Sequence, residues 1–76
     1  MLFKLAELME RDAEQLALLE SVDTGKPIRD ARAFDIPLAI GTTRWYAEAL
    51  DKIYGEVGTS PIDRLSWAVH EPLGVI

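Results

Sequence analysis

The chain has 76 residues, a net charge of −5 and no cysteine. A chain of this length makes one small domain that buries only about 60% of its unfolded surface, and no disulfide or thiolate–metal site can support its core. The acidic balance argues against nucleic-acid binding, which requires a basic face. No apolar run approaches the roughly 18 residues of a membrane span, and the first residues lack the pattern of a secretory signal, so we expect a cytoplasmic protein that is not bound to a membrane.

Residues Leu2–Val22 are rich in strong helix formers. Asp12, followed three residues later by Gln15, has the spacing of a capping box, which predicts a break or a sharp bend at that point. A single helix with a charged middle fits the periodicity almost equally well. The carboxylates of this segment are interpreted as a solvated polar face: Glu7, Glu10, Asp12 and Glu14.

Asp23–Pro27 is expected to end that helical region. Gly25 can adopt a left-handed conformation after the helix, Lys26 complements the negative end of the helix dipole, and Pro27 prevents continuation. A phosphate loop is rejected, because Glu20 stands where that motif requires glycine and because no Ser or Thr follows the lysine. Ile28–Phe34 is typical of a short helical or turn segment.

Ile36–Gly55 is predicted to be one long helix. Asp35 is the expected N-cap, Pro37 falls in the first turn, and Gly55 is the expected stop. Apolar residues occur in two registers, so most of the helix circumference needs cover from other parts of the protein.

The composition changes after Gly55. Glu56–Asp63 has the composition of a loop, Leu65–Val69 that of a strand, and Val75–Ile76 that of the opening of a second strand. Helices followed by strands indicate an α+β architecture, with a helical hairpin built on one long helix and a short β-hairpin arm. A lone hairpin is marginal in water, and its open edge favours pairing with a partner strand.

No catalytic group is evident from residue types and spacing. The only histidine, His70, has no second histidine at a metal-binding spacing and is interpreted as a surface residue. Neither serine of the strand region has a recognisable base partner. The aromatic residues Trp45, Tyr46 and Trp67 are interpreted as core rather than as a stacking platform.

Four stretches together resemble the NAD(P)-dependent aldehyde dehydrogenase superfamily. They are KLAELMERDAEQLALLES at Lys4–Ser21, DTGKPI at Asp23–Ile28, RWYAEALDKIYGEV at Arg44–Val57 and HEPLGVI at His70–Ile76. They occur in the family's order and spacing over nearly the whole chain. Their wording is most similar to bacterial enzymes that act on gamma-glutamyl-gamma-aminobutyraldehyde or betaine aldehyde.

The resemblance implies that the chain is a segment of a longer enzyme that oxidises an aldehyde to a carboxylic acid with NAD or NADP. Residues 1–55 would be a helical part of the cofactor-binding domain, and residues 56–76 a loop and the start of the oligomerisation strands. The cysteine nucleophile, the general-base glutamate and the cofactor contacts would lie outside this chain. We therefore expect no catalytic or cofactor-binding residue here, no bound cofactor and no activity in the isolated chain.

Two positions receive roles from the resemblance. The backbone carbonyl of Asp23 matches a ligand of a monovalent cation, although a residue of an ordinary helix end is the simpler interpretation. Leu38 matches a position that lines the aldehyde tunnel in some relatives, although an ordinary helix contact explains it equally well.

The expected partners are the remainder of the enzyme or copies of the chain in a homo-oligomer. An independent self-associating or partner-binding helical protein, from a truncated gene, is the alternative. An end in mid-strand at Val75–Ile76 favours a piece of a longer enzyme.

Overall fold

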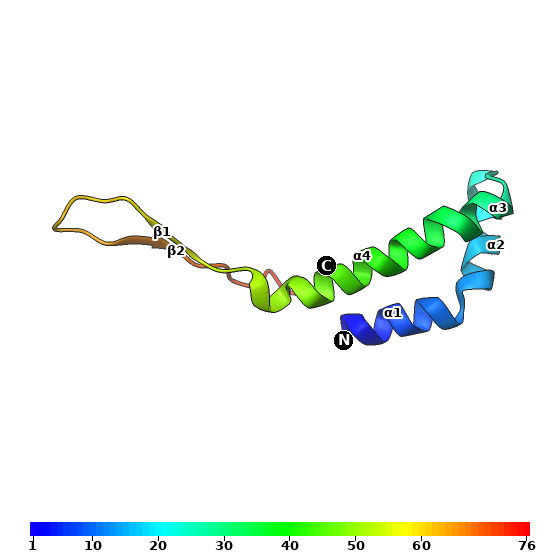
Figure 1. Ribbon diagram of the computed structural model, residues 1–76, viewed down its shortest axis with the longest axis horizontal. Helices are drawn as coiled ribbons and strands as arrows, with labels where there is room; N and C mark the ends of the chain where they lie inside the picture. The colour runs from blue at the N-terminus through cyan, green and yellow to red at the C-terminus, as the bar shows by residue number, and fades with distance from the viewer.

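The computed structural model describes residues 1–76 and confirms a mainly helical chain with a two-stranded arm (Figure 1). α1 runs alongside α4, α2 and α3 lie at one end of this pair, and the β-hairpin projects from the other end. The elements in chain order are α1 (Leu2–Arg11), α2 (Ala13–Thr24), α3 (Ile28–Asp30), the π-helical turn η1 (Ala31–Asp35), α4 (Ile36–Ala49), the 3-10 turn η2 (Leu50–Lys52), β1 (Glu56–Gly58) and β2 (Ser66–Ala68).

The molecule is extended and has almost no interior. It measures 61 × 23 × 20 Å, and its radius of gyration is 19.3 Å, against about 11 Å for a compact chain of this length. Its accessible surface is 6786 Å², against about 4,700 Å² for a compact protein of this mass. Only 4 residues are buried, and all are alanines: Ala6, Ala17, Ala31 and Ala49.

The chain breaks between α1 and α2, as the sequence predicted. Asp12 leaves the helical conformation, with φ −101° and ψ 18°. The predicted capping box is wrong, because the Asp12 side chain makes no hydrogen bond to the start of α2. Its carboxylate accepts hydrogen bonds from Nε and Nη2 of Arg11 instead, both at 2.8 Å. These bonds lower the pKa of Asp12, so the pair contributes stability above the ordinary aspartate pKa and loses it as pH falls through the lowered value.

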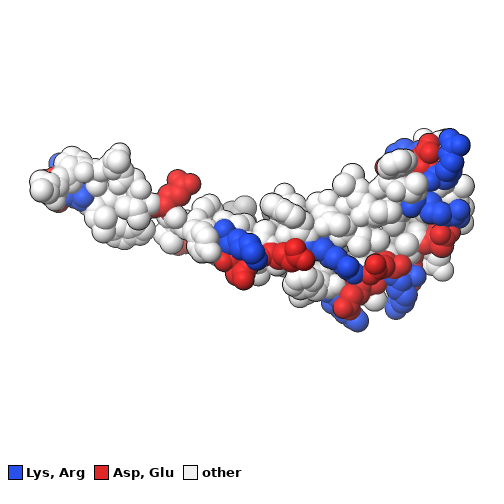
Figure 2. Space-filling model, in the orientation of Figure 1, with Lys and Arg blue, Asp and Glu red and all other residues white.

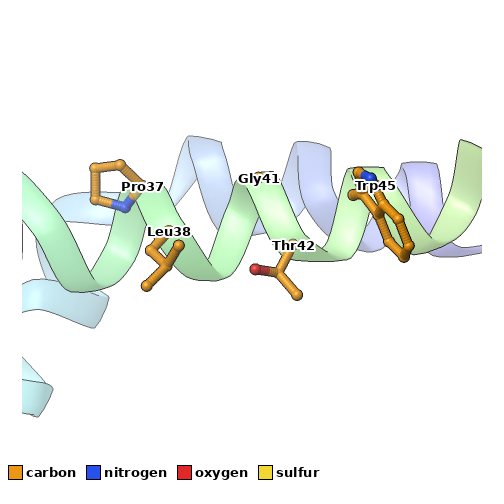
Figure 3. A pocket seen from close by; sticks show the side chains of 5 residues that line it. All are labelled: Pro37, Leu38, Gly41, Thr42 and Trp45. Carbon is orange, nitrogen blue, oxygen red and sulfur yellow. The ribbon is translucent and has the colours of Figure 1, made fainter.

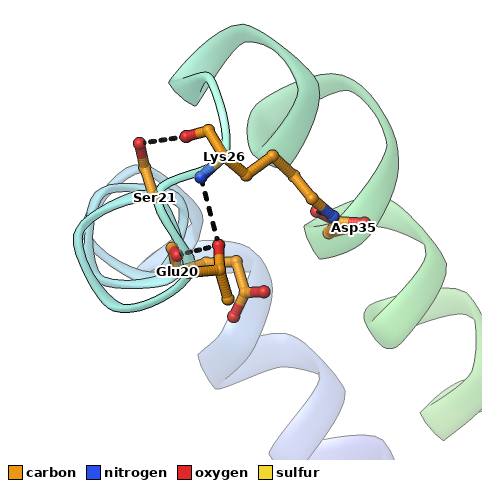
Figure 4. A network of polar contacts seen from close by, with 5 residues as sticks. Glu20, Ser21, Lys26 and Asp35 are labelled. Atoms are coloured by element: carbon orange, nitrogen blue, oxygen red, sulfur yellow. Dashed lines mark hydrogen bonds and ion pairs between the residues drawn. The ribbon is translucent and has the colours of Figure 1, made fainter.

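α2 ends as predicted at Gly25, which has a φ of 73°. The Gly25 N–H donates to the Ser21 carbonyl at 2.9 Å. The hydroxyl of Ser21 in turn donates to the Lys26 carbonyl at 2.6 Å (Figure 4). The left-handed glycine and the two hydrogen bonds together fix the direction in which the chain leaves the helix.

One continuous helical column is formed by α3, η1, α4 and η2. It begins earlier than the long helix predicted from the sequence. Asp35 is not an N-cap: its φ of −66° and ψ of −49° are helical, and its side chain makes no capping bond. The helical column also ends before Gly55, because Ile53 is already extended at φ −95° and ψ 100°. Gly55 has a different role. A Cβ atom on it would lie 2.5 Å from the Ala68 carbonyl oxygen, so a side chain there would collide with the backbone of the arm.

The arm pairs β1 with β2 in antiparallel register, with Val57 opposite Trp67. The strand predicted at Leu65–Val69 is present in its centre, but the prediction for its surroundings is wrong. Its partner comes from Glu56–Gly58, which was predicted to be loop, and Val75–Ile76 forms no strand. All residues of both strands are exposed.

Ion pairs join helices that lie far apart in the sequence. Arg44 of α4 donates to Glu10 of α1 at 2.5 Å, and Arg32 of η1 donates to Glu14 of α2 at 2.8 Å. Figure 2 shows the charged side chains gathered over the helical part, while most of the arm is uncharged. On the predicted solvated face the three glutamates are exposed as expected and Asp12 is half-buried, and two of the carboxylates, those of Glu10 and Glu14, also link neighbouring helices. No helix here combines the length and hydropathy needed to span a membrane.

Candidate functional site

A hollow with a largely apolar surface lies on the side of α4 that faces away from α1. Its volume is about 340 Å³, and it is lined by Pro37, Leu38, Gly41, Thr42 and Trp45 (Figure 3). Gly41 has no side chain, which leaves room between Leu38 and Trp45. Those two side chains are 70% and 61% exposed. We call Leu38, Thr42 and Trp45 the outer stripe of α4.

The outer stripe offers apolar contact and no acid or base. Its only polar side-chain groups are the hydroxyl of Thr42 and the indole N–H of Trp45. The Trp45 ring packs edge-on against Tyr46, with ring centroids 4.9 Å apart and an interplanar angle of 85°. Such a surface can bind an apolar chain or the apolar face of another element, but it cannot itself transfer a proton or attack a carbonyl.

Leu38 and Asp23 do not share a hollow. Leu38 lines the hollow on the outer side of α4, whereas Asp23 lines another of about 410 Å³ with residues of α1 and α2 and with Ile36. No group of three or more His, Cys, Asp or Glu side chains gathers in a way that could hold a metal ion. A cation at Asp23 would therefore depend on backbone carbonyls, and both residue roles stay predictions.

A polar network closes the turn between α2 and η1 (Figure 4). Lys26 Nζ donates to the Asp35 carboxylate at 2.5 Å, and the Lys26 N–H donates to Thr24 Oγ1 at 3.3 Å. The hydrogen bond with Asp35 raises the pKa of Lys26. The Lys26–Asp35 ion pair therefore contributes its full stabilisation of the fold below the ordinary lysine pKa. This stabilisation is lost as pH rises through the raised pKa of Lys26.

The sequence did not predict the pairing of Lys26 with Asp35. It assigned Lys26 to the helix dipole and Asp35 to a cap, because each role depends only on near neighbours. The pairing depends on the way the turn folds back, and the only available signal was the presence of opposite charges on either side of a Gly-Lys-Pro turn.

The remaining candidates lie on the surface. Trp45, Tyr46 and Trp67 are all more than half exposed, so their interpretation as core residues is wrong within this chain. His70 is exposed beyond the end of β2, as expected for a surface histidine. The structure thus shows apolar and aromatic surfaces and no assembled catalytic group.

Comparison with known proteins shows which family this chain resembles. The profile of the aldehyde dehydrogenase family matches residues 1–76. The NADP/NAD-dependent aldehyde dehydrogenase PuuC of Escherichia coli K12 is 60% identical over 73 residues, which cover 96% of this chain and 15% of that enzyme. The aminoacetaldehyde dehydrogenase of Pseudomonas aeruginosa is 45% identical over 75 residues, which cover 99% of this chain and 15% of that enzyme.

A solved structure has the same fold over the matching stretch. The indole-3-acetaldehyde dehydrogenase AldA of P. syringae, solved in complex with NAD+ and IAA, superposes with a TM-score of 0.79 at 45% identity, covering 96% of this chain and 15% of that one. The chain therefore spans about 15% of the length of the relatives it matches. It belongs to the aldehyde dehydrogenase family and corresponds to one segment of such an enzyme.

Proposed function

We propose that the chain acts as a structural segment of an NAD(P)-dependent aldehyde dehydrogenase, which oxidises an aldehyde to a carboxylic acid. One observation carries this proposal: the chain keeps the fold of the matching stretch of a solved aldehyde dehydrogenase while only 4 of its residues are buried. Its surface exceeds that of a compact chain by about 2,100 Å², more than the roughly 800 Å² that one partner contributes to a standard protein interface. The rest of such an enzyme would supply the missing cover.

The chain contributes surfaces to this reaction rather than reacting atoms. It contains no cysteine, so the thiolate that attacks the aldehyde would come from another part of the enzyme. The Gly25–Lys26 pair does not fit a phosphate of the nicotinamide nucleotide either. Gly25 and Lys26 follow the C-terminal end of α2, where free carbonyls repel phosphate, whereas phosphates are bound at helix N-termini.

We propose that Leu38 and the rest of the outer stripe lie along the route of the aldehyde. The apolar lining of the hollow supports this assignment, as do the names of relatives that act on aminoacetaldehyde and indole-3-acetaldehyde. The three outer-stripe side chains carry no carboxylate, but Leu38 and Thr42 also line a second hollow whose lining includes Glu20 and Asp35. The carbonyl of Asp23 remains our candidate ligand for a monovalent cation.

We also propose that the arm serves assembly. β1 and β2 pair only with each other, and one edge of each strand is open. An exposed two-stranded sheet gains stability by pairing with a further strand. In the complete enzyme this strand would come from another part of the protein or from a neighbouring subunit, which gives a homo-oligomer.

A graft into the E. coli relative tests the proposal. The matching 73 residues of PuuC are replaced by this chain, and NAD(P)H formation is followed with aldehydes. We expect the graft to keep kcat/KM within about tenfold of the unmodified enzyme. The graft changes packing contacts that are the same in the ground state and in the transition state. We also expect the 76-residue chain alone to form no NAD(P)H.

Two controls make the result decisive. A graft carrying the same residues in scrambled order should neither assemble nor react. A grafted enzyme that assembles with the mass of the unmodified enzyme and yet oxidises no aldehyde would refute the proposal. The alternative, an independent self-associating protein, is favoured by the same exposed surface and would be supported by a graft that fails to assemble.

A further inference from the structure

The π-helical turn η1 sets the rotation of everything that follows it in the helical column. The Ile36 N–H donates to the carbonyl of Ala31, five residues earlier, instead of to the carbonyl four residues earlier. The turn therefore contains one residue more than an α-helical turn. One residue corresponds to about 100° of rotation, so every side chain of α4 points about 100° away from its direction in an uninterrupted helix.

Pro37 explains why the turn is present. Proline has no N–H to donate, and inside an α-helix its ring collides with the carbonyl four residues earlier, which here belongs to Ala33. The wider turn immediately before Pro37 moves that carbonyl away from the ring. Asp35, the last residue of η1, is tied to Lys26 by an ion pair in which both side chains are partly shielded, at 39% and 32% exposure.

The exposure pattern shows what the turn changes. In an uninterrupted helix, Leu38, Thr42 and Trp45 would lie two, three and four turns beyond Ala31 on the same face. Ala31 is fully buried, yet Leu38 and Trp45 are 70% and 61% exposed. The stripe that continues the buried face instead is only partly exposed and consists of Ile36, Ala39, Ile40 and Thr43.

This inner stripe packs on α1. The Thr43 hydroxyl lies 3.8 Å from Met9 Sδ, and the neighbouring Arg44 reaches Glu10. Without the extra residue, the outer stripe would face α1 and the inner stripe would point about 100° away from it. The apolar hollow around Leu38 would then be lost from the outer side.

We propose that Pro37 and Lys26 are positioning residues, which hold the π-helical turn and thereby turn the outer stripe toward the aldehyde. The link to the aldehyde rests on the function proposed above, whereas the control of rotation does not. Neither residue takes part in the chemistry. Each determines which side of α4 faces the aldehyde and which side packs on α1.

The absence of cysteine allows a direct test by single-cysteine labelling of the full 76-residue chain. Thr42→Cys reports on the outer stripe and Thr43→Cys on the inner stripe, and the two positions differ by one residue and carry the same side chain. With Pro37 present, we expect a maleimide to react on the order of tenfold faster at position 42, because position 43 must first separate from α1. Circular dichroism monitors the helix content of each variant.

In the Pro37→Ala background, position 37 regains its N–H and loses the ring, so the turn can become α-helical. We expect the ratio of the two labelling rates to fall by on the order of fivefold. Lys26→Met should lower it in the same direction. Deleting Ala33 together with Pro37→Ala removes the extra residue and should restore the original ratio, because the helix is then uninterrupted with the same rotation of α4.

The proposal is overturned if both positions react equally in the chain with Pro37, or if Pro37→Ala leaves the ratio unchanged. It is also overturned if the deletion does not restore the ratio while helix content is maintained. In the grafted enzyme, Pro37→Ala should change the ratio of kcat/KM between a long-chain and a short-chain aldehyde by about fivefold. An inactive graft would refute the proposed function, while the labelling result would still decide the control of rotation.

Discussion

Gly55→Ala is expected to separate β1 from β2. The new Cβ would lie 2.5 Å from the Ala68 carbonyl oxygen, and this oxygen belongs to the backbone and cannot rotate away. Overpacking of this kind costs about 1–3 kcal/mol, and an isolated two-stranded hairpin is at best marginally stable in water. We therefore expect the arm to lose its pairing, measured as loss of amide hydrogen-exchange protection in Glu56–Gly58 and Ser66–Ala68.

Gly58→Ala is the matched control. It lies in the same arm, and its Cβ would approach no atom more closely than 3.7 Å, which is an ordinary van der Waals contact. It should leave the protection of the arm close to that of the unmodified chain. Equal protection in the two alanine variants would show that Gly55 is not required for the close approach.

Ala6→Leu is expected to push α1 away from α4. Ala6 is the one fully buried residue of α1, and α1 packs on α4. The larger side chain has no space to enter, and overpacking costs about 1–3 kcal/mol. Because the chain buries so few residues, we expect α1 to lose hydrogen-exchange protection throughout and the Arg44–Glu10 ion pair to open.

Ala33→Leu controls for the added side-chain volume, since Ala33 is exposed. It should leave the protection of α1 unchanged. If Ala6→Leu and Ala33→Leu behave alike, α1 does not depend on close packing through Ala6.

The helix boundaries show which features the sequence could predict. The break at Asp12 and the left-handed Gly25 were predicted because the signal lies within a few neighbouring residues. The partner of β2 was missed because pairing across the arm is not local, and Glu56–Gly58 is adjacent to residues typical of loops. The helix end was placed at Gly55 because glycine often ends helices, whereas here it is required by the approach of Ala68.

The rotation of α4 illustrates the limit for the candidate site. The sequence contains apolar residues in two registers along Ile36–Gly55, and periodicity gives no reason to choose between them. The π-helical turn before Pro37 decides that Ile40 and Thr43 face inward while Leu38 and Trp45 face outward. The aromatic residues were expected in a core for the same reason, since composition indicates that they need cover but not which molecule supplies it.

The central claim is that the apolar surfaces of this chain must be covered by another molecule. Its most direct test is the mass of the 76-residue chain in solution, measured by light scattering on a size-exclusion column. A dimer, a tetramer or a larger assembly of 8.5 kDa chains is the predicted result, because copies must then cover what the rest of the enzyme would cover. A single monodisperse peak with the mass of one chain would contradict the account.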